Sequence, residues 1–84
     1  MIVYKFHKPD CAPCYALSRI LKHIEIPEDI EIINLNVNEE TNKAIAKENS
    51  IDKVPALMFE NGIKIVGLKS EDEVVSFLNR ELYL

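Results

Sequence analysis

The chain has 84 residues, 48% of them hydrophobic and 29% charged, which is the balance of one folded domain rather than a disordered segment. Its 10 Lys and Arg residues against 14 Asp and Glu give a net charge of −4, which disfavours nucleic acid as a partner. No apolar run approaches the roughly 20 residues that a membrane helix needs.

Three elements are predicted in the first part of the chain. Residues 2–7 are rich in β-branched and aromatic side chains, and their nearly continuous apolar character is typical of an interior strand. A helix is expected over residues 12–24, where apolar residues fall on one face. These residues are Leu17, Ile20, Leu21 and Ile24. Residues 30–37 return to strand character.

The middle of the chain predicts a helix followed by a hairpin. Residues 39–49 are helical by composition, with acidic residues in the first turn. Residues 55–59 form the next expected strand. The Asn61-Gly62 pair is a strong hairpin signal that leads into a last strand over residues 63–66.

A final helix is predicted after Gly67. Ser70, with Glu73 three residues later, makes a capping box. One face of this helix then carries Val74, Phe77, Leu78 and Leu82. The order β-α-β-α-β-β-α starts with a parallel βαβ unit and ends with an antiparallel hairpin and a covering helix. It predicts an α/β fold with a four-stranded mixed sheet and helices on both faces.

The two cysteines, Cys11 and Cys14, close almost no loop, so their spacing indicates redox chemistry rather than a structural staple. Cys11 falls where the first strand ends and the first helix begins, and Pro13 suits an early helical position. The helix dipole and Lys8 favour the Cys11 thiolate, whereas Asp10 opposes it. We expect Cys11 to face solvent and attack, and Cys14 to be covered and to resolve the mixed disulfide.

Other interpretations of these residues are structural. A zinc site needs four ligands, and only His7 and His23 could join the cysteines, so we predict no metal. His7 ends the first strand near the cysteines, where it either tunes them and accepts a proton or is half-buried structure. We expect Lys5 to carry its ammonium group to water along an apolar stem.

The strand–C-x-P-C–helix unit, followed by Val54-Pro55 at the head of the third strand, resembles the thioredoxin superfamily over essentially the whole chain. The resemblance implies a thioredoxin fold, a cis Pro55 packed beside the cysteine pair, and a Val54 backbone that accepts the substrate strand. It also implies that no cofactor is bound and that the redox centre is a Cys11–Cys14 disulfide.

The subfamily signals are mixed. The segment KPDCAPC at residues 8–14 resembles glutaredoxins, whereas VPALMFENGIKIVG at residues 54–67 resembles thioredoxins. Lys5 stands where thioredoxins carry a buried Asp, and Gly67-Leu68 stands where glutaredoxins carry Gly-Gly. By this resemblance the substrate-binding or glutathione-binding residues are Lys8, Val54, Pro55 and Gly67.

Three functions therefore remain open. The first is a cytoplasmic, monomeric thiol–disulfide oxidoreductase that reduces protein disulfides and receives electrons from a thioredoxin-reductase-type enzyme. The second is a glutathione-dependent glutaredoxin. The third is a non-catalytic module that keeps the fold to bind a partner or a metal, against which the intact cysteine pair argues. The opening MIVYKFHK does not resemble a secretory signal, so we expect an intracellular protein.

Overall fold

The computed structural model describes residues 1–80. Its elements follow the predicted order and have these bounds: β1 Ile2–His7, α1 Ala12–His23, β2 Glu31–Asn36, α2 Glu40–Glu48, β3 Ala56–Phe59, β4 Lys64–Val66 and α3 Glu71–Leu78. The strands and the first two helices end within one residue of their expected limits. The prediction for Leu82 lies outside the described residues.

The four strands form one mixed sheet in the order β2-β1-β3-β4. β1 pairs in parallel with β2 and antiparallel with β3, and β3 pairs antiparallel with β4. Val3, for example, lies between Ile32 on β2 and Phe59 on β3. The mixed sheet is therefore confirmed, and β1 is the interior strand that its apolar sequence indicated.

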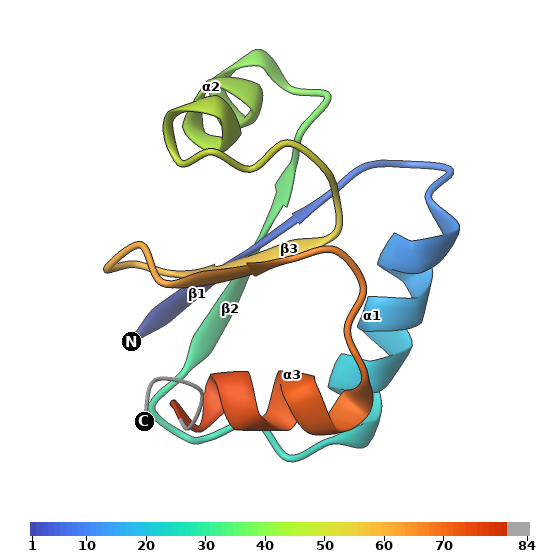
Figure 1. The fold of residues 1–84 in the computed structure, drawn as a ribbon, viewed down its shortest axis with the longest axis vertical. Helices are drawn as coiled ribbons and strands as arrows, with labels where there is room; N and C mark the ends of the chain where they lie inside the picture. Colours follow the sequence, from blue (N-terminus) through green and yellow to red (C-terminus); the bar gives the residue numbers. More distant parts are fainter. Residues whose placement is uncertain (81–84) are drawn as a thin grey trace.

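Helices cover both faces of this sheet, as Figure 1 shows. α1 and α3 lie on one side and α2 lies on the other. The alternation of side chains along each strand divides the buried residues between the two faces. On β1, Val3 belongs to the cluster under α1 and α3, whereas Phe6 belongs to the cluster under α2.

The two faces hold two separate apolar cores. Under α1 and α3, the core is built around Val3, Leu17, Leu57, Phe59, Val74, Phe77 and Leu78. The rings of Phe59 and Phe77 meet there with their centroids 4.8 Å apart. Under α2, the core consists of Phe6, Ala46, Ile51, Ala56 and Met58. The second core thus has smaller side chains, because alanine takes two of its positions.

Local signals in the sequence explain the start of α3 and the turn between β3 and β4. Ser70 Oγ accepts the Glu73 N–H at 3.2 Å while Glu73 Oε1 accepts the Ser70 N–H at 3.4 Å, which confirms the capping box of α3. Between β3 and β4, the Gly62 N–H donates to the Phe59 carbonyl at 2.8 Å. Gly62 has φ +95°, a conformation that favours glycine at this turn.

None of the helices within residues 1–80 is both long enough and apolar enough to cross a membrane.

Candidate active site

Cys11 and Cys14 lie at the start of α1 and are joined by a disulfide, with their Cα atoms 5.2 Å apart. Cys11 is the N-cap residue, and its Sγ accepts the Cys14 N–H at 3.2 Å. Pro13 stands in the first helical turn, where its missing N–H leaves no helical hydrogen bond unmade. The Cys11 sulfur therefore lies at the positive end of the helix, which stabilises a thiolate there in the reduced protein.

The exposure that we predicted for Cys11 is wrong for this disulfide form. Cys11 is 6% exposed and Cys14 is 3% exposed, so both residues are buried. The sulfur of Cys11 turns back toward the helix to accept the Cys14 N–H, which removes it from the surface. Cys11 is nevertheless the more exposed of the two cysteines, as predicted.

The loop before Cys11 presents the charged residues of the motif. Lys8 and Asp10 are both exposed. Asp10 has φ +55°, a left-handed conformation that Asp tolerates better than most residues because its short side chain can bond locally. This turn places Cys11 at the head of α1, and the opposing electrostatic effects that we predicted for Lys8 and Asp10 stay predictions.

Lys5 is more deeply buried than we expected. It is 8% exposed and its Nζ donates a hydrogen bond to the Ser18 hydroxyl of α1. The side chain of Lys5 lies on the same face of β1 as Val3, under α1, because alternate strand residues share a face. Burial lowers the pKa of Lys5, and the nearby charge of Lys22 lowers it further.

His7, two residues further along β1, shares this face of the sheet. Burial lowers the pKa of His7, and the positive charge of Lys5 adds to this shift, while Glu39 acts in the opposite direction. The lowered pKa leaves the imidazole neutral at pH 7, so it has a free nitrogen to accept a proton. A role for His7 in proton transfer stays a prediction.

The Val54-Pro55 peptide bond is cis, as the resemblance implied. Pro55 is fully buried, and its carbonyl accepts the Gly67 N–H at 2.8 Å, so Gly67 lies beside it. Within residues 1–80, neither the N–H nor the C=O of Val54 takes part in a hydrogen bond. These two backbone groups stand immediately before β3 and are available to pair with another chain.

Gly67 sits where two chain segments approach each other. Its φ of +88° favours glycine, and a Cβ added there would meet Lys53 Cε at 3.3 Å. The side chain of Lys53 therefore lies over Gly67. This contact ties the segment before the cis-proline to the segment that leads into α3.

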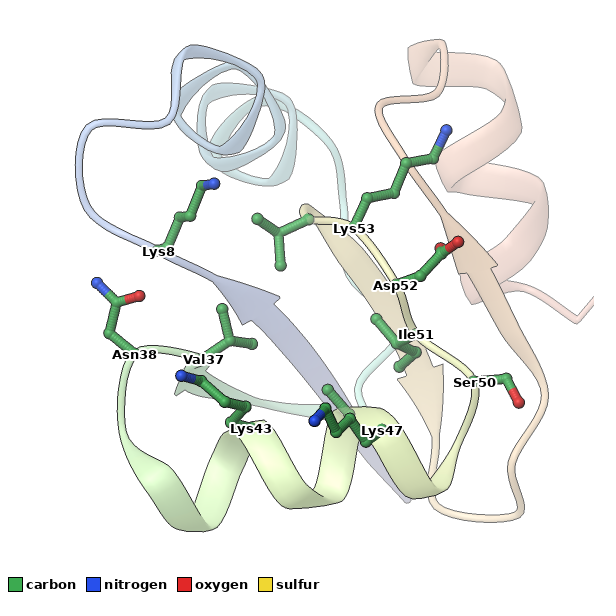
Figure 2. Close-up of a pocket in the computed structure, with 11 residues that line it drawn as sticks. Lys8, Val37, Asn38, Lys43, Lys47, Ser50, Ile51, Asp52 and Lys53 are labelled. Atoms are coloured by element: carbon green, nitrogen blue, oxygen red, sulfur yellow. The ribbon is translucent and has the colours of Figure 1, made fainter.

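A pocket of about 770 Å³ brings two predicted site residues, Lys8 and Val54, to one place. Figure 2 shows that α2 forms one of its walls, with Lys43 and Lys47 on the side that faces Lys8. These two lysines were not among the predicted site residues. Their spacing of four residues, which puts both on one face of a helix, is the signal that could have found them.

Among the residues that the structure describes, no three His, Cys, Asp or Glu side chains lie close enough together to hold a metal ion. His23 ends α1 as an exposed residue.

Comparison with known proteins identifies the family. A sequence model described as thioredoxin matches residues 1–80. The chain belongs to the thioredoxin family. No curated protein matches it.

Two solved thioredoxins are similar in structure. A mutant thioredoxin from Halobacterium salinarum NRC-1 has 25% identity and a TM-score of 0.76, and the match covers 99% of this chain and 75% of that one. The oxidised form of mitochondrial thioredoxin 3 from Saccharomyces cerevisiae has 24% identity and a TM-score of 0.77, with coverage of 94% and 76%. These likenesses confirm the thioredoxin fold that the sequence resemblance implied.

The family and the cysteine geometry together support a thiol–disulfide oxidoreductase. Thiol–disulfide exchange needs a thiolate and a second thiol within reach of the first. Cys11 at the start of α1 and Cys14 three residues later supply this pair without a cofactor.

Proposed function

We propose that this protein reduces disulfide bonds in other proteins and takes its electrons from an enzyme of the thioredoxin-reductase type. The observation that carries this proposal is the Cys11–Cys14 disulfide at the N-terminus of α1 in a chain of the thioredoxin family. The unpaired backbone of Val54 gives an extended substrate strand a place to bind. We also propose a monomer in the cytoplasm, where thiols are kept reduced.

In the proposed cycle, the Cys11 thiolate attacks one sulfur of the substrate disulfide. A Cys11–substrate disulfide forms, and the other substrate sulfur leaves as a thiolate that takes up a proton. Cys14 then loses its proton and attacks Cys11 Sγ, which restores the Cys11–Cys14 disulfide and releases the second substrate thiol. Two electrons pass to the substrate, and NADPH returns them to this protein through the reductase. No carboxylate takes the Cys14 proton in this scheme; His7 or water accepts it.

Glutathione is the second candidate donor, because Lys8, Val54 and Gly67 stand at positions that glutaredoxins use. We propose that it is the poorer donor. Three exposed acidic residues, Glu71, Asp72 and Glu73, occupy the first turn of α3, a few residues after Gly67. Negative charges at this place repel the carboxylates of glutathione, and each close like-charge pair weakens binding by a few tenths of a kcal/mol to about 1 kcal/mol.

The proposal is tested with one disulfide-bonded protein substrate and two sources of electrons. One arm contains NADPH and thioredoxin reductase, and the other contains glutathione with glutathione reductase and NADPH. We expect substrate reduction in both arms, faster in the first. Cys11→Ser abolishes it, and Cys14→Ser accumulates a mixed disulfide that mass spectrometry detects. Equal or faster reduction with glutathione would favour the glutaredoxin function, and no reduction in either arm would favour a non-catalytic module.

A further inference from the structure

The pocket beside the cis-proline segment combines an apolar floor with a basic rim. Val37, Ile51 and Val54 supply apolar surface, while Lys8, Lys43 and Lys47 stand around it. In Figure 2, Lys8 lies across the pocket from the other two lysines, and Lys53 points away from them, in the direction of α3. We call the pocket with Lys8, Lys43 and Lys47 at its rim the lysine pocket.

The charge of this pocket is opposite to that of the whole chain. The protein carries four more acidic than basic residues, yet only one carboxylate, that of Asp52, lines the pocket against four lysines. Over residues 1–80, the single ion pair joins Arg80 to Asp29, and no hydrogen bond engages the ammonium groups of Lys8, Lys43 or Lys47. These exposed cations lack a partner within the described part of the molecule, so an anionic group from another molecule can pair with them.

Two residues of the pocket are close in sequence to the residues of the redox site. Lys8 precedes Cys11 by three residues in the same loop, and Val54 precedes the cis-proline. Because Val54 lines the pocket, a substrate strand that pairs with its free backbone lies next to the pocket. Side chains that flank the substrate cysteine then come within reach of the rim lysines.

We propose that the lysine pocket binds Asp and Glu side chains that flank the target disulfide in the protein substrate, so that it selects acidic substrates. This inference rests on the proposed reduction of protein disulfides and names the class of substrate. The carboxylates pair with Lys43 and Lys47 while the rest of the segment covers Val37 and Ile51. Such pairs are solvent-exposed, so they act mainly on the rate of productive encounter and weaken with added salt.

The test uses two peptides, each with one intramolecular disulfide, that differ only in two residues beside a cysteine. These residues are Glu in one peptide and Gln in the other. The protein is reduced chemically beforehand, and the rate of a single transfer is measured, so that no donor enzyme is needed. We expect the acidic peptide to react about three- to tenfold faster at low salt, with the difference lost at about 0.5 M NaCl.

Variants locate the effect in the pocket. Lys43→Gln with Lys47→Gln removes the preference for the acidic peptide and leaves the rate with the neutral peptide unchanged. Arg19→Gln with Lys22→Gln is the matched control, because it removes two positive charges from α1, outside the pocket. The preference should survive in this control.

The outcomes separate the two proposals. Equal rates for the two peptides, or an equal loss of preference in both double variants, overturn the lysine pocket while the reduction of disulfides stands. Failure to reduce either peptide overturns the proposed function itself. If oxidised glutathione reacts with a strong dependence on Lys43 and Lys47 while the acidic peptide shows no preference, the pocket is a glutathione site and the inference is wrong.

Discussion

The two faces of the sheet are packed in different ways. The face under α1 and α3 holds Phe59, Phe77 and Leu78 in a closely filled core, with the side chain of Lys5 buried at its edge. The face under α2 uses Ala46 and Ala56 and has the lysine pocket beside it. The first face is closed by large side chains, and the second carries the pocket that we propose as a binding site. A small domain can thus separate stability from recognition by using the two sides of one sheet.

Shortening one buried side chain in each core gives the largest expected effect and tests the difference in packing between the two faces. Phe77→Ala removes a fully buried ring that packs on Phe59, and we expect it to lower the free energy of unfolding by about 3–5 kcal/mol. Ile51→Ala should cost nearer the lower end of about 2–5 kcal/mol, because Ile51 loses fewer buried atoms than Phe77 and, at 6% exposed, is slightly less buried. Urea unfolding measures both values, with Phe77→Leu as a milder variant if Phe77→Ala does not fold. A larger loss for Ile51→Ala would contradict the difference between the faces.

Lys5 is the exception on the well-packed face, and its replacement tests what its burial costs. Because the pKa of Lys5 is lowered in the folded state, the unfolded chain binds more protons below the ordinary value of 10.5, and folding is penalised there. We expect Lys5→Met to raise the free energy of unfolding at pH 7 by about 1–2 kcal/mol.

The gain in the free energy of unfolding from Lys5→Met should shrink as the pH rises. The stability of the natural protein should rise relative to Lys5→Met as the pH climbs toward 10.5, since the buried amine then loses its charge. Urea unfolding of both proteins at several pH values from 7 to 10.5 measures the difference between their free energies of unfolding, which should narrow. A gap that is constant or widens with pH would mean that Lys5 is not penalised by burial.

The smallest expected effect concerns His7, which shares the face of Lys5. Its folded pKa lies below the ordinary 6.5, mainly through burial, so stability should fall as the pH drops from 6.5 through that lowered value. Removal of the Lys5 charge in Lys5→Met should move the His7 pKa upward, because a neighbouring cation disfavours the imidazolium. Titration of the His7 imidazole signals by NMR in both proteins checks the shift of the His7 pKa, and urea unfolding at pH 7 and below checks the fall in stability. An unchanged His7 pKa in Lys5→Met would show that the two groups are not coupled.

The sequence predicted the elements well because each has a local signal. The alternation or periodicity of apolar residues marked the strands and helices, and the Ser70–Glu73 pair marked the start of α3. The C-x-P-C motif and Val54-Pro55 identified the family, which the match over residues 1–80 confirms.

Other features could not be predicted, because they depend on residues distant in sequence. We expected the ammonium group of Lys5 in water because the residues next to Lys5 in the sequence give no sign of its hydrogen bond to Ser18. That contact forms only when α1 packs against β1. The burial of Cys11 comes from the direction of its sulfur, which residue spacing does not specify. The lysine pocket joins Lys8 to Lys43, which α1 and β2 separate along the chain, and only the folded sheet brings them to one site.

The complete burial of β3 has a consequence for how faithfully the chain must assemble. All four residues of this strand are buried, Ala56 and Met58 toward α2, Leu57 and Phe59 toward α1 and α3. A slip of β3 by one residue against β1 would turn Leu57 and Phe59 toward α2, and Ala56 and Met58 toward α1 and α3. Both cores would then be mispacked, so the burial of β3 on both faces fixes its register against β1.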